Sequence, residues 1–229
     1  MRTLILGDVH GCAAELEELL AAAAFAEDDR LIFVGDLVAR GPDTRRVLAL
    51  ARDAGAVAIR GNHEQRLLDV RGARARAVEA PRLSPGHERV FAELDAADWQ
   101  LLEAMPLWHE LPDLALRVVH AGIVPGRPMP EQQPWALLHM RTLRDGEASD
   151  KRGGELWGRR YQGPPHIVFG HNAVDGLQLH PHATGLDTGC VYGGSLSALV
   201  LRDGEEVPAP ADRRDCIVSV KARRAYVSY

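Results

Sequence analysis

The sequence lacks the features that stabilise secreted and membrane-embedded proteins. It has only three cysteines, Cys12, Cys190 and Cys216, an odd number without paired spacing. We therefore expect free thiols in a reducing compartment rather than a disulfide framework. Although 46% of the residues are hydrophobic, no apolar run approaches the roughly 18 residues that a membrane-spanning helix requires. These absences predict a cytoplasmic protein that does not cross a membrane.

The sequence also has fewer basic than acidic residues. The chain has 27 Lys and Arg against 32 Asp and Glu, so its formal net charge is −5. A chain with this balance offers no general attraction to a nucleic-acid duplex or an anionic membrane surface. An anionic substrate must therefore be bound by a local positive site. There is no internal repeat or low-complexity tract, and we expect a single domain over residues 1–229.

The first sixty residues alternate between strand and helix patterns. Three short apolar runs are typical of buried strands, at residues 2–6, 31–34 and 56–59. Two intervening segments have helical spacing or helix start and stop signals, residues 12–24 and residues 42–55. Because strand–helix–strand connections are right-handed, the three strands are expected to be parallel neighbours with their carboxyl ends at one edge.

The remainder of the chain is less regular. We expect a helical excursion at about 65–106. It comprises a continued helix at 65–69, an exposed excursion or small helical cap at 70–89, and a helix over 84–104 with Asp95 as its candidate cap. Later strands are predicted at 114–119, 167–169, 176–180, 196–201 and 217–220. A helix is expected at 134–144, and loops at 125–130, 144–154 and 207–215. Turns separate these later strands more often than helices do, which favours a second, mixed or antiparallel sheet and an α+β fold.

Metal-capable side chains follow strand-like runs beside glycines at several points. They occur in GDVHG, GDLVARG, GNHE, VVHAG and FGHN, and the candidate ligands are Asp8, His10, Asp36, Asn62, His120 and His171. Such oxygen and imidazole donors suit two divalent cations bridged by a carboxylate, for which we assign Asp36. Manganese is the expected metal, with iron, zinc and cobalt as alternatives. A water held between two cations would be acidified into a nucleophile.

Other polar residues of these motifs suit phosphate chemistry. His63 follows Asn62 directly and is assigned as the general acid for the leaving oxygen. Arg40 lies in a glycine-flanked turn, where its planar fork can bind phosphoryl oxygens. Arg60 and Arg141 are weaker candidates for further phosphate contacts. We expect the remaining histidines to be surface or core residues: His87, His109, His139, His166, His180 and His182.

Taken in order, these motifs resemble the calcineurin-like metallophosphoesterases, within the phosphoprotein phosphatase superfamily. The resemblance spans Gly7 to His171 and extends to the run LDTGCVYGG at 186–194. It implies a four-layer α/β/β/α sandwich in which the matched positions bind two metals and phosphate. It also implies a hydrolase, and attack by a metal-activated water needs no covalent enzyme intermediate.

One departure points to a substrate class. Protein phosphatases of this superfamily usually have Asp where Ala39 stands, and that carboxylate orients the catalytic histidine. The motifs GDLVARGP and LDTGC look more like those of bacterial symmetrical diadenosine tetraphosphatases, which implies cleavage of diadenosine tetraphosphate into two ADP. Glu64, where we expect Asp in the closest members, and the short chain depart from that group. The alternatives are a serine/threonine or dual-specificity phosphoprotein phosphatase, and a non-catalytic metal-binding module, which the complete set of candidate residues disfavours.

Overall fold

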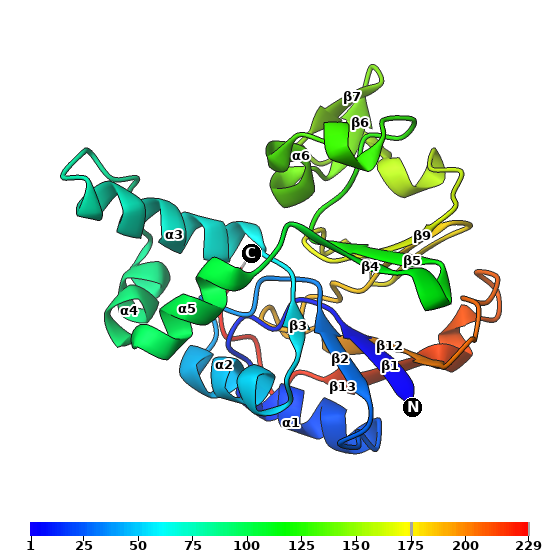
Figure 1. The fold of residues 1–229 in the computed structure, drawn as a ribbon, viewed down its shortest axis with the longest axis horizontal. Coiled ribbons are helices and arrows are strands. Elements are labelled where there is room, and N and C mark those ends of the chain that lie inside the picture. Colours follow the sequence, from blue (N-terminus) through cyan, green and yellow to red (C-terminus); the bar gives the residue numbers. More distant parts are fainter. Residues whose placement is uncertain (175, 229) are drawn as a thin grey trace.

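The structure is a computed structural model and describes residues 1–174 and 176–228. Its first sheet has the strand order β13-β12-β1-β2-β3 (Figure 1), built from β1 (Arg2–Leu6), β2 (Arg30–Phe33), β3 (Val57–Ala58), β12 (Ser195–Arg202) and β13 (Ile217–Lys221). β1 pairs in parallel with β2, and β2 with β3, which confirms the predicted parallel unit. The two late strands join it antiparallel, β12 along β1 and β13 along β12.

The second sheet has the order β10-β11-β9-β5-β4 and is mixed, as predicted. Its strands are β4 (Trp108–Leu111), β5 (Leu116–Val119), β9 (His166–Phe169), β10 (Gln178–His180) and β11 (Ala183–Gly185). β9 is parallel to both β5 and β11, whereas the edge strands β4 and β10 run antiparallel. The sequence patterns did not indicate β4 or β11.

A small third sheet corrects two predictions. It has the order β7-β6-β8, from β6 (Thr142–Arg144), β7 (Glu147–Ser149) and β8 (Glu155–Leu156). The segment at 144–154 was expected to be a loop, and a helix was expected to reach residue 144. Asp145 and Gly146 have φ of 52° and 83°, the two positive values of a tight hairpin turn. The Asp-Gly pair was therefore the hairpin signal that the sequence interpretation missed.

Six α-helices are present in the described ranges: α1 (Ala13–Ala22), α2 (Thr44–Asp53), α3 (Asn62–Ala75), α4 (Pro85–Glu93), α5 (Ala96–Ala104) and α6 (Pro134–His139). The continuous helix expected over 84–104 is wrong, because the chain is extended at Leu94 and Asp95. Asp95 does cap α5, accepting hydrogen bonds from the backbone N–H groups of Ala97 and Asp98. No helix of the described chain has the length and apolarity needed to span a membrane.

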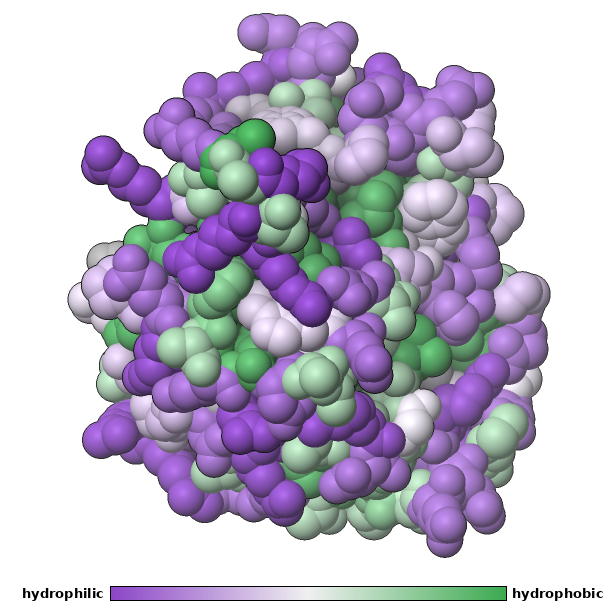
Figure 2. Space-filling view, turned by 60° about the vertical axis from the view of Figure 1, so that its left-hand side comes forward, coloured by the Kyte–Doolittle hydropathy of each residue, from purple (hydrophilic) through white to green (hydrophobic). Residues whose placement is uncertain are grey.

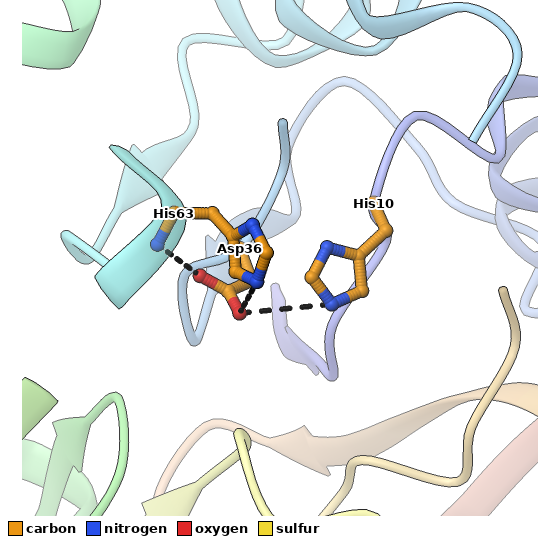
Figure 3. Close-up of side chains that lie close together, drawn as sticks. All are labelled: His10, Asp36 and His63. Atoms are coloured by element: carbon orange, nitrogen blue, oxygen red, sulfur yellow. Dashed lines mark hydrogen bonds and ion pairs between the residues drawn. The ribbon is translucent and has the colours of Figure 1, made fainter. Parts of the chain in front are cut away.

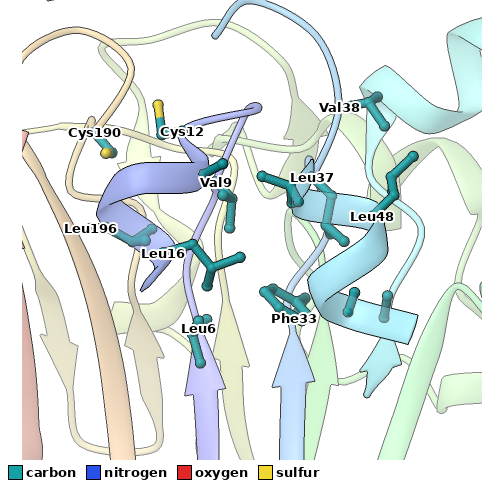
Figure 4. Packing of buried hydrophobic residues seen from close by; sticks show 14 of the residues in the cluster. Leu6, Val9, Cys12, Leu16, Phe33, Leu37, Val38, Leu48, Cys190 and Leu196 are labelled. Carbon is teal, nitrogen blue, oxygen red and sulfur yellow. The ribbon is translucent and has the colours of Figure 1, made fainter. Parts of the chain in front are cut away.

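The core explains the layered arrangement. Successive side chains of a strand point to opposite faces, so Leu4 and Leu6 pack on one face of the first sheet while Ile5 packs on the other. Figure 4 shows the first face, where α1 and α2 cover the sheet through Leu16 and Leu48. The opposite face meets the second sheet, and α6 and Trp157 cover the far side of that sheet. Two mixed sheets flanked by helices form the four-layer sandwich that was expected.

Few apolar side chains remain outside these layers. Figure 2 shows that the face turned toward the viewer is largely hydrophilic, with apolar residues in separate small patches. The three cysteines are free thiols, as predicted, with Cys12 and Cys190 buried in the first core layer. Their burial gives them a packing role like that of other small apolar residues.

A buried carboxylate ties together the loops that follow β2 and β3. Glu64 is 0% exposed. Its two oxygens accept hydrogen bonds from the backbone N–H groups of Asp36 at 2.9 Å, Val38 at 3.0 Å and Gly61 at 2.8 Å. Each of these groups would otherwise be buried without a partner, which costs about 1–3 kcal/mol per group. Glu64 therefore sets the distance between the loop that carries Asp36 and the helix start that carries Asn62.

We predict that Glu64→Gln lowers the free energy of unfolding by about 3 kcal/mol, because the amide NH₂ cannot accept a hydrogen bond from a backbone N–H group. Urea denaturation of the metal-free protein, followed by circular dichroism, measures this change. Glu103→Gln, at an exposed position, is the matched control and should change the value by less than about 0.5 kcal/mol. Equal stabilities of the two variants would contradict a structural role for Glu64.

Candidate metal centre

The candidate ligands come together where strands of both main sheets end. Asp8 and Asp36 follow β1 and β2, Asn62 begins α3 shortly after β3, and His120 and His171 follow β5 and β9. Parallel strands bring their carboxyl ends to one edge, so residues far apart in the sequence meet there. His10 comes from the same loop as Asp8, and Figure 3 shows that its ring and that of His63 both approach the Asp36 carboxylate.

Asp36 is the centre of the cluster. Its Oδ2 lies 3.6 Å from His10 Nε2, 3.5 Å from His120 Nε2 and 3.9 Å from His63 Nε2. Its Oδ1 accepts the backbone N–H of His63 at 3.0 Å. One carboxylate oxygen thus lies within 4 Å of imidazoles from three different segments, as the predicted bridging role of Asp36 would require.

The second group of donors surrounds Asn62. Its Oδ1 lies 3.1 Å from His120 Nε2 and 2.9 Å from His171 Nδ1. The other ring nitrogens of these histidines face the carbonyl oxygens of Val34 at 3.0 Å and His139 at 3.2 Å. A ring nitrogen facing a carbonyl carries the proton, so the nitrogens facing Asn62 have free lone pairs. Three acceptors therefore converge, and a cation fits among them.

The first group is oriented in the same way. His10 Nδ1 lies 3.1 Å from the carbonyl oxygen of Val38, which directs its Nε2 toward Asp36. Asp8 is 4% exposed, and both of its oxygens accept the backbone N–H of His171 at 3.0 Å. This contact links the loop after β1 to the loop after β9.

Close backbone packing explains the glycines of the motifs. A Cβ on Gly61 would lie 2.2 Å from Asp36 Oδ1, and one on Gly170 would lie 2.0 Å from Asp8 Oδ1. The carboxylates are therefore seated directly against the chain. Three candidate ligands also have left-handed backbone conformations: His10 at φ 48°, Asp36 at 50° and His171 at 63°. Such conformations are disfavoured for residues with a Cβ and tend to cluster at functional sites.

Burial shapes the protonation of these groups. It raises the pKa of Asp36 to about 7, and burial together with the charges of Asp187 and Asp36 raises the pKa of Asp8 well above its ordinary value. Burial lowers the pKa of His120 to about 4, and it also lowers that of His10, with a further contribution from Arg40. The imidazoles are therefore neutral and ready to donate lone pairs, whereas the carboxyls need nearby positive charge to ionise.

A small cavity opens onto the cluster. Its volume is about 30 Å³, and it is lined by His10, Asp36, Arg40, Asn62, His63, Arg141, Arg152, His171, Ala173, Asp187 and Tyr192. Arg40 Nη1 donates to the hydroxyl of Tyr192 and lies 3.4 Å from His10 Nε2. Arg141 Nη1 donates to the carbonyl oxygen of His171 at 3.0 Å and to Asn172 Oδ1 at 3.2 Å. Guanidinium groups thus face the candidate ligands across the cavity.

Arg60 is not brought to this cavity. Its guanidinium instead donates to Gln65 Oε1 at 3.2 Å and to the carbonyl oxygen of Glu103 at 3.0 Å, so the geometry gives no support to the predicted phosphate contact. Sequence reasoning had also singled out no role for Arg152, Asp187 or Tyr192, which line the cavity. Asp187 and Tyr192 did have a signal in the sequence, because both lie in the run at 186–194 that supports the family resemblance.

His87 departs from the expectation that it is an ordinary surface or core residue. Its Nε2 lies 2.9 Å from His63 Nδ1, although 24 residues separate the two histidines. No sequence pattern pointed to this contact, because it depends on how α4 packs against the loop that contains Arg40. Ala39, in the same loop, is fully buried and carries only a methyl group.

Comparison with known proteins identifies the family. A family model described as calcineurin-like phosphoesterase matches residues 1–204. The chain therefore belongs to the calcineurin-like phosphoesterases and is a metal-dependent phosphohydrolase. Divalent cations are the cofactor of this class, and the side chains around Asp36 include groups that could hold them.

The relatives share a narrower description. The chain is 32% identical to the bis(5'-nucleosyl)-tetraphosphatase PrpE [asymmetrical] of Halalkalibacterium halodurans, covering 96% of this chain and 97% of that protein. It is 39% identical to the symmetrical bis(5'-nucleosyl)-tetraphosphatase of Pectobacterium carotovorum, covering 91% of this chain and 73% of that protein. A crystal structure of a protein provisionally described as a diadenosine tetraphosphatase superposes with a TM-score of 0.81 at 34% identity, covering 96% of this chain and 93% of the other.

We predict that cation binding releases protons from carboxyl groups and strengthens as pH rises toward about 7, the pKa of Asp36. Since the pKa of Asp36 is about 7, the metal-free carboxyl is mostly protonated below that pH and must ionise to bind. Affinity should rise about tenfold per pH unit for each proton displaced, up to that pKa. The imidazoles are already neutral and release few protons.

Calorimetric titration with Mn²⁺ in buffers of different ionisation enthalpy counts the released protons. Asp36→Asn should abolish tight binding, whereas Asp53→Asn, at an exposed position on α2, should leave affinity and proton release unchanged. Affinity that is independent of pH below the pKa of Asp36 would show that the carboxyls are ionised before the cation arrives.

Proposed function

We propose that this chain hydrolyses dinucleoside polyphosphates, with diadenosine tetraphosphate as substrate and manganese as the metal. The relatives named above support this substrate class, and they include both symmetrical and asymmetrical enzymes. The sequence motifs favour symmetrical cleavage to two ADP, and that product assignment is part of the proposal. The cytoplasmic location expected from the sequence remains a prediction.

The observation that carries the proposal is the set of residues that line the cavity. Arginines from three segments, Arg40, Arg141 and Arg152, line it together with the candidate ligands. The cavity's volume of about 30 Å³ is far below the roughly 300–1,000 Å³ of pockets that enclose a small-molecule ligand, so it cannot enclose a whole dinucleotide. We therefore place the phosphates of a dinucleoside polyphosphate at the mouth of the cavity, beside these arginines, and its nucleosides on the surrounding surface. Local arginines also meet the need for a positive site in a protein of net charge −5.

The candidate residues divide into two ligand sets. Asp8 and His10 are proposed to hold one cation, Asn62, His120 and His171 the other, and Asp36 both. When bound, the cations supply a nucleophilic water and neutralise phosphoryl charge. The convergence of acceptors at Asp36 Oδ2 and Asn62 Oδ1 supports this division.

The remaining residues act on the phosphates directly. Arg40 and Arg141 are proposed to bind the non-reacting phosphoryl oxygens, since a planar guanidinium can offer two N–H groups to one phosphate. His63 is proposed to protonate the leaving oxygen through Nε2, which faces the cluster. A nucleotide phosphate is a better leaving group than an alkoxide, so its departure demands less of this acid.

The substrate prediction is tested by incubating the manganese-loaded protein with diadenosine tetraphosphate, and separately with a serine phosphopeptide, followed by chromatography of the products. We expect two ADP from each dinucleotide and little phosphate from the peptide. AMP plus ATP would replace the symmetrical assignment by an asymmetrical one. Phosphate released from the peptide alone would overturn the proposal. Asp36→Asn serves as the inactive control, with Asp53→Asn as the active one.

The acid assignment predicts unequal effects on two reactions of the same enzyme. His63→Ala should lower kcat for diadenosine tetraphosphate by about 100-fold, and lower it further for a phosphate ester with an alkoxide leaving group. The ratio of the two losses is the measurement. Equal losses would argue against leaving-group protonation as the role of His63. Metal content, measured by atomic emission, should match that of the unmodified protein.

A further inference from the structure

We propose that His87 is a positioning residue for His63, and that Ser84, His87 and His63 form a chain of hydrogen bonds that aims His63 Nε2 at the metal centre. This inference deepens the proposed function and rests on it, because His63 is the acid proposed there. His63 would otherwise be attached to α3 only through its own side-chain torsions, and a misaligned acid loses much of its effect.

The contact uses the two nitrogens of His63 for different purposes. Its Nδ1 lies 2.9 Å from His87 Nε2, within hydrogen-bond distance. Its Nε2 lies on the other side of the ring, 3.9 Å from Asp36 Oδ2. The planes of the two imidazoles differ by 4°, and their centroids are 4.8 Å apart. His87 thus contacts His63 at Nδ1, while the proposed acidic nitrogen Nε2 faces the candidate ligands.

The next link fixes the orientation of His87. Ser84 Oγ lies 2.8 Å from His87 Nδ1, and it also accepts the backbone N–H of His87 at 3.5 Å as the cap of α4. If the ring Nδ1–H donates to Ser84, then His87 Nε2 is an acceptor and His63 Nδ1–H donates to it. Burial, with the charges of Arg40 and Arg66, lowers the pKa of His87 and favours this neutral form.

The acid role of His63 requires that His63 Nδ1–H donates to His87 Nε2, and not that His87 Nε2–H donates to His63 Nδ1. A histidine that gives up its Nε2 proton must keep the proton on Nδ1, since otherwise it would become an imidazolate anion. The chain from His63 to His87 to Ser84 preserves that proton before and after the transfer. The hydrogen bonds therefore remain unchanged while Nε2 loses and regains its proton.

Packing holds α4 where this contact requires it. Arg89 Nη2, two residues after His87, donates to the carbonyl oxygen of Gly41 at 2.6 Å. Val90 is 1% exposed and belongs to the first core cluster. A Cβ on Gly86 would lie 3.7 Å from the backbone nitrogen of Arg40. The start of α4 is therefore seated against the loop that also carries the candidate phosphate ligand.

A double-mutant cycle on the manganese-loaded protein tests the proposal with diadenosine tetraphosphate. We expect His87→Ala to lower kcat by about 10- to 100-fold with little change in KM or metal content. In a His63→Ala background, the same substitution should cause no further loss, because His87 acts through His63. His87→Gln places an amide oxygen near the position of ring Nε2 and should recover most of the activity. An equal loss in both backgrounds, or no loss at all, would overturn the proposal.

A spectroscopic measurement checks the contact without any substrate. In the metal-free protein, proton NMR should show a downfield imidazole N–H signal from the His63–His87 bond. This signal should disappear in His87→Ala and His63→Ala and persist in Glu88→Ala, at an exposed position on the same helix. Its persistence in His87→Ala would refute the pairing. If the unmodified protein fails to hydrolyse the dinucleotide while the signal behaves as expected, the proposed function fails and the pairing stands.

Discussion

The hydrogen bonds of the buried Glu64 carboxylate are the constraint on which the site depends. They join the loop after β2 to the start of α3, and they do so in a place that water cannot reach. Because unpaired buried N–H groups are costly, the two segments can hardly separate without losing stability. Asp36 and Asn62 are attached to these segments, so the spacing of the candidate ligands follows from a hydrogen-bonded backbone rather than from the ligands themselves.

Burial of the site disfavours the charged forms of its carboxyl and imidazole groups. Carboxylates and imidazole lone pairs are held together in a buried place, where burial raises the pKa of Asp36 to about 7 and lowers that of His120 to about 4. Positive backbone φ values at several ligands add local strain. The hydrophobic layers packed on both faces of the first sheet hold the loops that carry these residues in place. Bound cations would offset the charge of the carboxylates, so we expect metal binding and the ionisation of these groups to be coupled.

Several features were predictable because their causes are local or topological. Alternating strand and helix patterns placed Asp8, Asp36 and Asn62 past parallel strand ends, and the structure puts all three at one edge. Two other features were marked in the sequence by cap and turn residues, although the periodicity of the chain did not show them. The break between α4 and α5 follows from the capping of α5 by Asp95, and the β6–β7 hairpin from the positive φ values of Asp145 and Gly146. Arg60 follows a strand as expected, yet its side chain turns toward Gln65 and Glu103.

The sequence by itself determined the chemistry of this protein: which donors are present, the order of the motifs, and the parallel unit that brings their loops to one edge. Hydrophobic periodicity and glycine placement are sufficient for that, because they act over a few residues. Only the tertiary structure decided which side chains touch. It brought His87 within hydrogen-bond distance of His63 and placed Tyr192 and Arg152 in the lining of the cavity. It directed Arg60 away from that cavity. These contacts join segments that are distant in the chain, and their geometry depends on how helices pack on the sheet, which no local pattern specifies.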